Sequence, residues 1–203
     1  MRKSIKPLFT ALALLFAFLA CSQEPLFYYI AMEVEPIKPA IGGSVSRFAR
    51  TDIGSGHQLY VANGSLWVFD TTGTTIPVWA SFFPQPGGKI KSVAATANNE
   101  LFTIDYDGVV KHWNDGSSIW ESVSGSPAGA QQIFGAGNYL FIGSAERIFA
   151  CDSASISTSM TNLGPAGLLL GAVNVGTTWY LATKTGIYEI AGPPTSNPLS
   201  SSP

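Results

Sequence analysis

Apolar residues along most of the chain form short runs separated by turn-forming residues, and one arrangement of them recurs four times. Each copy is an apolar run, a turn and a second apolar run, as in the stretch QLYVANGSLWVFD. With Leu59, Leu101, Leu140 and Trp179 taken as equivalent, the copies follow one another at intervals of 42, 39 and 39 residues. Two apolar runs joined by a short polar turn predict a β-hairpin. The predicted hairpins span residues 58–70, 100–114, 139–152 and 178–192.

The residues between the paired runs indicate tight turns. Asn63–Gly64 and Asp107–Gly108 are strong hairpin signals, because glycine, asparagine and aspartate tolerate the positive φ that such turns need. Thr185–Gly186 has the same place in the fourth copy. The third copy departs from the pattern, since Glu146–Arg147 stands at its turn.

The second run of each hairpin is mainly apolar on both faces. In the first copy, Trp67 and Phe69 lie on one face and Leu66 and Val68 on the other. A sheet exposed to water on one side would alternate apolar and polar residues, so these sheets are predicted to be covered on both sides. Flanking segments supply the remaining strands: 90–97, 130–137 and 167–176 as inner strands, and 76–83, 118–123 and 156–163 as outer strands.

Repetition at this interval, with sheets covered on both faces, points to blades stacked around an axis. From Val45 to Gly192 the chain resembles the β-propeller repeat families, loosely the WD-repeat and quinoprotein-like groups. It lacks the Gly-His and Trp-Asp pairs of true WD repeats, and Trp113–Asn114 is the nearest approach. The resemblance implies an all-β domain over residues 44–192, with about four blades of four strands. The alternative is a shortened piece of a larger propeller.

The fourth copy has no outer strand of its own after Gly192. Residues 193–203 are rich in proline and serine and are predicted to be disordered. Residues 26–36 are β-prone but have no hairpin partner. One hypothesis is that Ile30–Glu35 pairs beside Ile187–Ala191 and covers the free edge of the last blade. The alternative is that residues 21–43 are only a tether.

The N-terminus has the layout of a bacterial export signal. Basic residues are followed by an uncharged run from Pro7 to Ala20, which is shorter than the roughly 20 apolar residues of a membrane-spanning helix. Residues 1–20 are therefore predicted to be a signal peptide. Ala20–Cys21 resembles the end of a lipobox, which implies lipidation of Cys21, although Phe18 and Leu19 depart from the family pattern. The alternative is ordinary secretion with cleavage after Ser22.

Removal of residues 1–20 leaves eight Lys and Arg residues against thirteen Asp and Glu, a net charge of about −5. A surface with this charge has no cluster of basic residues to bind nucleic acid and no basic patch to bind a membrane. Acyl chains on Cys21 are therefore the predicted membrane anchor. With Cys21 modified, Cys151 has no disulfide partner. We expect Cys151 to be a small buried residue on a strand, and the alternative is a reactive thiol.

Few residues suggest metal or cofactor chemistry. His57 and His112 are the only histidines, and their spacing indicates no metal site. Asp105-x-Asp107–Gly108 resembles the start of a calcium loop but lacks the later ligands, so a hairpin turn is the preferred interpretation. The five tryptophans could line a carbohydrate or protein site, but inter-blade core is the preferred interpretation. No cofactor and no metal are predicted.

The favoured function is that of a non-enzymatic envelope lipoprotein, which binds a protein or envelope ligand or serves as a scaffold. Ser22 after the cysteine favours the outer membrane by the rules of the lipoprotein family. The alternative is a propeller enzyme of the envelope, either a quinoprotein-like dehydrogenase or a glycan hydrolase. A hydrolase needs two carboxylates facing one cleft. The carboxylates that lie near one another in the sequence are Asp105, Asp107, Asp115 and Glu121, all in one repeat.

Overall fold

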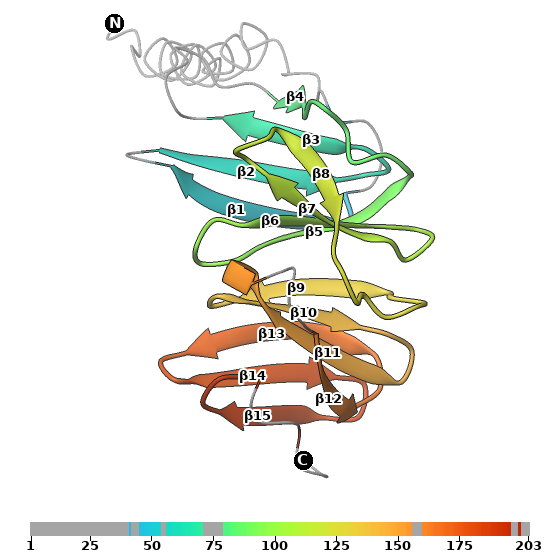
Figure 1. Cartoon of the computed structure of the whole chain (residues 1–203), viewed down its shortest axis with the longest axis vertical. Helices are drawn as coiled ribbons and strands as arrows, with labels where there is room; N and C mark the ends of the chain where they lie inside the picture. The colour runs from blue at the N-terminus through green and yellow to red at the C-terminus, as the bar shows by residue number, and fades with distance from the viewer. Residues whose placement is uncertain are drawn as a thin grey trace, which may run out of the picture. The chain divides into compact units, whose positions relative to one another are not determined.

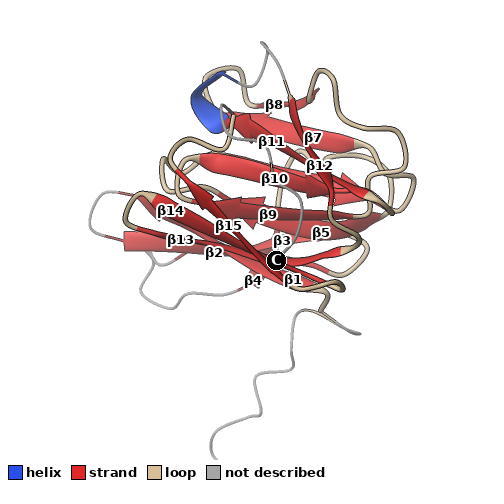
Figure 2. Cartoon of the chain, turned by 90° about the horizontal axis from the view of Figure 1, so that it is seen from below, coloured by secondary structure: helices blue, strands red, loops and turns tan. Residues whose placement is uncertain are grey.

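The computed structural model describes residues 41, 45–53, 56–70, 79–155, 160–195 and 199. They belong to a compact unit, Ile41–Pro203. The predicted signal peptide, Cys21 and the Ile30–Glu35 strand lie outside the described residues. Within the described part, regular structure consists of β-strands and one short 3-10 turn, η1 (Ser153–Ser155) (Figure 2). None of the described segments is a helix that could cross a membrane.

The strands form four antiparallel sheets, each built from strands that follow one another in sequence. We call these sheets blades 1 to 4 (Figure 1). Blade 1 contains β1 (Arg47–Ile53), β2 (Gly56–Ala62), β3 (Leu66–Asp70) and β4 (Trp79–Ser81); blade 2 contains β5 (Ile90–Ala95), β6 (Leu101–Asp105), β7 (Val110–Asn114) and β8 (Ile119–Ser122). Blade 3 contains β9 (Gln132–Ala136), β10 (Tyr139–Gly143), β11 (Arg147–Asp152) and β12 (Thr161–Pro165); blade 4 contains β13 (Leu169–Val175), β14 (Thr178–Thr183) and β15 (Ile187–Ala191).

The first strand of each blade contacts the first strand of the next, so that β1 packs beside β5, β5 beside β9, and β9 beside β13. One buried apolar cluster fills each of the three spaces between successive blades. The prediction of an all-β, propeller-like fold with about four blades is therefore confirmed. Blade 4 has three described strands, in line with the missing outer strand of the fourth repeat.

The predicted hairpin turns are also present. Gly64 and Gly108 adopt φ of 93° and 82°, values that favour glycine. The third turn closes differently, since Ser144 Oγ accepts a hydrogen bond from the Arg147 amide at 3.1 Å. The apolar pattern did not predict β1, because the exposed face of this strand carries the charged residues Arg50 and Asp52 beside Phe48.

Adjacent blades approach so closely that some positions exclude a side chain. A Cβ atom on Gly135 of β9 would lie 1.8 Å from the carbonyl oxygen of Ala95 on β5. Between blades 3 and 4, Trp179 Nε1 donates a hydrogen bond to the carbonyl of Ala136 at 3.0 Å. Main-chain contact and aromatic side chains therefore hold successive blades together.

The two ends of the blade series differ from its interior. Among the described strands, no extensive contact joins blade 1 to blade 4. Of the residues after blade 4, Leu199 donates its amide to the Leu163 carbonyl at 2.9 Å and packs against the cluster between blades 3 and 4. The predicted bounds of the repeat domain and of the tail, 44–192 and 193–203, stay predictions.

Candidate functional site

Two cavities adjoin blade 2, and both reach the end of the blade at which Glu100 lies. In a sheet of four sequential antiparallel strands, the first and third connections lie at one end. In blade 2 these connections are Thr96–Glu100 and the turn that follows Asn114. Glu100 lines both cavities, so the two form one candidate site around this end of the blade.

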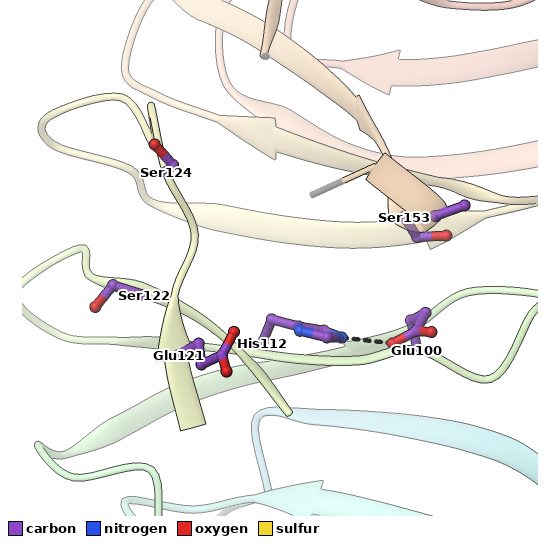
Figure 3. A pocket seen from close by; sticks show the side chains of 7 residues that line it. Glu100, His112, Glu121, Ser122, Ser124 and Ser153 are labelled. Atoms are coloured by element: carbon purple, nitrogen blue, oxygen red, sulfur yellow. Dashed lines mark hydrogen bonds and ion pairs between the residues drawn. The ribbon is translucent and has the colours of Figure 1, made fainter. Parts of the chain in front are cut away.

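The first cavity lies between blades 2 and 3, has a volume of about 310 Å³, and contains a close contact between an imidazole and a carboxylate. His112 Nε2 lies 2.5 Å from Glu100 Oε2, and both side chains are mostly shielded from solvent. His112 pairs across the strands with Glu121, so the imidazole lies between two carboxylates (Figure 3). The cavity is lined by Glu100, His112, Glu121, Ser122, Ser124, Ser153 and Ala154.

Neighbouring groups hold this arrangement in place. Asn114 Nδ2 donates to Glu121 Oε1 at 2.8 Å, and the His112 ring packs against Phe102 with the ring centroids 5.1 Å apart. Ser153 Oγ is engaged with Asn98 Oδ1 at 2.7 Å rather than with the imidazole. The cavity can therefore accept cationic or hydrogen-bonding groups, but it has no serine activated by His112.

The second cavity is a groove of about 670 Å³ between blades 1 and 2. Aromatic rings form one part of its lining, and Phe82 packs edge-on against Trp113 with the ring centroids 4.9 Å apart. Phe83 is 89% exposed. The groove is lined by Thr51, Asp52, Gln58, Tyr60, Phe82, Phe83, Asn98, Asn99, Glu100, Leu101, Trp113 and Asp115.

Two asparagines fix the turn that separates the cavities. Asn99, with a left-handed φ of 67°, accepts a hydrogen bond from the Asp52 amide of blade 1 at 2.7 Å. Asn98 Oδ1 accepts hydrogen bonds from Ser153 of blade 3 and from Thr96. This turn therefore ties blade 2 to both of its neighbours and holds Glu100 at the junction.

The site is acidic. The lining residues include Asp52, Glu100, Asp115 and Glu121, and neither cavity has a lysine or arginine among the described residues that line it. Arg50 forms an exposed ion pair with Asp52 at 2.7 Å, which offsets part of this charge at the rim. The groove therefore favours a neutral or basic ligand with apolar or planar groups.

The four carboxylates singled out from the sequence do not converge. Asp105 is buried and its Oδ1 accepts hydrogen bonds from the amides of Asp107 and Val109 at 3.0 and 2.8 Å, so it holds a turn, as expected. Asp115 and Glu121 line different cavities. Neither of the two cavities is lined by two of these four residues, although Glu100 and Glu121 both line the first.

Neither the apolar pattern nor a known motif singles out Glu100 or the two asparagines before it. The signal that could have found them is the polar run Thr96–Glu100 between two strongly apolar strands. Elsewhere, three of the five tryptophans are inter-blade core as expected, because Trp113 and Trp120 pack between blades 1 and 2 and Trp179 between blades 3 and 4. Trp113 also lines the groove.

The other candidate residues do not form a metal site in the described part of the structure. Within the part of the chain that the structure describes, no group of three or more His, Cys, Asp or Glu side chains is placed to hold a metal ion. Cys151 is buried on β11, and burial, with a smaller contribution from Asp152, raises the pKa of its thiol to about 12. Cys21 lies outside the described residues.

No family model matches the chain, and no curated protein is significantly similar to it in sequence. Many solved structures are similar in fold, including the following three. PorZ, an essential bacterial surface component of the type-IX secretion system of Porphyromonas gingivalis, matches with a TM-score of 0.54 and 21% identity over 77% of this chain. The computationally designed protein Ika4 matches with a TM-score of 0.53 and 15% identity over 75% of this chain and 94% of its own.

The third structure is BamB from Moraxella catarrhalis, with a TM-score of 0.49 and 14% identity over 69% of this chain and 41% of that chain. The matched part spans only 21% of PorZ, about a fifth of that protein's length. At these identities the likeness concerns the fold alone.

Proposed function

We propose that the chain is a non-enzymatic binding module of the bacterial cell envelope, and that it recognises a basic polypeptide segment in the groove between blades 1 and 2. One observation carries this proposal: the groove combines aromatic rings, of which Phe83 is exposed and Phe82 and Trp113 are partly exposed, with carboxylates, and it has no lysine or arginine among its described lining residues. Aromatic rings bind apolar side chains, and carboxylates bind lysine and arginine side chains. Function in a propeller depends on such a surface and not on the frame itself.

The envelope location rests on the N-terminal sequence. A signal peptide over residues 1–20, acyl chains on Cys21 and an outer-membrane position are all parts of the proposal. The similarity in fold to PorZ, a bacterial surface component, supports an envelope location in general terms. A tethered chain with an open acidic groove would present that groove to other envelope proteins.

The binding proposal is tested with a synthetic peptide of alternating lysine and phenylalanine and a second peptide with glutamate in place of lysine. We expect the full chain to bind the basic peptide more tightly, with an affinity that falls as salt is added. Phe83→Ala removes an exposed ring, and Asp115→Asn removes a charge. Each should weaken binding by about fivefold, since an aromatic contact and an exposed ion pair each contribute up to about 1 kcal/mol.

The matched control is Ile119→Ala, because Ile119 is an exposed apolar residue of β8 that lines neither cavity. Its affinity for the basic peptide should equal that of the unchanged protein. Equal binding of the basic and acidic peptides, or equal losses in all three variants, would rule out the groove as the site.

A further inference from the structure

Blade 4 presents a face that has the character of an inter-blade interface but has no blade against it among the described residues. Ile187 is paired with Ala182 at the start of β15. The equivalent positions in the other blades are occupied by apolar residues that pack against the following blade. These are Leu66, Val110 and Ile148, which are exposed by 0%, 1% and 0%, whereas Ile187 is 66% exposed.

Other residues of blade 4 extend this face. Tyr180 stands at the position of Tyr60, Phe102 and Phe141, which are all buried against the next blade. Here Tyr180 instead lines an open, mainly apolar groove of about 290 Å³, together with Val173 and Ile187. The surface of this groove therefore corresponds to one half of an inter-blade interface, without the second blade that covers it elsewhere in the protein.

Blade 1 shows the complementary situation on its opposite face. Phe48 on β1 is paired with Val61. The equivalent residues of blades 2 and 3 are Val93 and Ile133, which pack against the preceding blade and are each exposed by 1%. Phe48 is 69% exposed. Blade 1 thus exposes Phe48, although Val61 beside it is fully buried, and blade 4 exposes Ile187, both at positions that are buried between blades elsewhere.

The interior of the protein shows how these two positions meet between successive blades. Leu66 of blade 1 and Val93 of blade 2 belong to one buried cluster, and Val110 of blade 2 and Ile133 of blade 3 belong to another. By the same relation, Ile187 would meet a residue at the position of Phe48. Large apolar surfaces left open on a protein mark places where another surface binds.

We propose that the occupant is a second copy of this chain, with blade 4 of each copy packed on blade 1 of the other. Two copies related by a twofold axis satisfy both open faces at once and close a ring of eight blades, which lies within the range known for propellers. A single β-prone segment such as residues 26–36 would cover only one of the two faces. The dimer is independent of the proposed ligand groove, which lies at the junction of blades 1 and 2.

The experiment measures the mass of the full chain in solution by sedimentation velocity and native mass spectrometry over a range of concentrations. We expect a dimer whose dissociation constant rises at least tenfold in Ile187→Lys and in Phe48→Glu, because each change buries an unpaired charge. Both positions are exposed within one copy, so neither change should alter the thermal unfolding of the monomer.

A chain that carries both changes provides the decisive measurement. If Ile187 of one copy meets Phe48 of the other, the introduced lysine and glutamate pair, and the double variant should regain part of the lost affinity. The matched control, Ile119→Lys on β8, should dimerise as the unchanged protein does. A monomer at all concentrations, an open series of larger oligomers, or losses in the double variant that simply add would overturn the proposal.

Discussion

At the scale of single residues, burial and hydrogen bonding decide which chemically versatile side chains can act. Asp105 is committed to two backbone amides of its own turn, and His112 is committed to Glu100. Cys151 is enclosed in the cluster between blades 2 and 3. These residues stabilise the frame, whereas Phe83 and Asp115 at the groove are placed to contact a ligand.

The thiol of Cys151 should be unreactive in the folded protein. Its pKa is raised to about 12 by burial, so almost no thiolate is present near neutral pH. In a Cys21→Ser chain, we expect a disulfide reagent to modify Cys151 only after unfolding in guanidinium. The pKa of Cys151 is higher in the folded protein than in the unfolded chain, where it is about 9. The contribution of this thiol to the free energy of unfolding is therefore fully present below pH 9 and is lost as the pH rises towards 12. Rapid labelling of the native protein at pH 8 would contradict this account.

At the scale of strands and turns, the spacing between blades depends on where side chains are absent. β9 approaches β5 so closely at Gly135 that a Cβ atom there would lie 1.8 Å from a carbonyl oxygen. The turn Thr96–Glu100 then locks the junction through Asn98 and Asn99. Small residues and turn amides therefore set the geometry in which the two cavities open.

Gly135→Ala should lower the free energy of unfolding by about 3 kcal/mol, because the added methyl group overlaps backbone that cannot rotate away. Urea denaturation followed by tryptophan fluorescence measures the loss. Gly116→Ala is the matched control, since its Cβ would meet only Asn114 Oδ1 at an ordinary distance of 3.5 Å. Equal stabilities of the two variants would show that the blades do not approach at Gly135 as described.

At the scale of the whole molecule, blades that are not adjacent in sequence are also joined. Arg47 of blade 1 lies over the ring of Phe134 in blade 3, 4.1 Å from its centroid, and donates to Gln132 at 3.3 Å. Burial lowers the pKa of Arg47 below its usual value. Blades 1, 2 and 3 thus form one connected frame, which an anchor at its N-terminus would hold as a unit.

The proposed anchor makes a prediction about the entire protein in its bacterial host. Mass spectrometry of the processed chain should find an N-terminus at Cys21 with acyl chains attached, and Cys21→Ala should move the protein out of the membrane fraction, because lipid chains supply the membrane affinity. Cys151→Ala is the matched control and should remain membrane-bound. An N-terminus at Gln23 would instead identify ordinary secretion.

The sequence by itself determined the repeating hairpins, the number of blades and the position of most strands, because alternation and glycine turns act over a few residues. It did not predict β1, whose exposed face at the end of the blade series carries Arg50 and Asp52. Only the tertiary structure brought Glu100 beside His112, and Asn98 beside Ser153. Those contacts join residues of different strands or blades, and their positions depend on how the sheets pack, which no local pattern records.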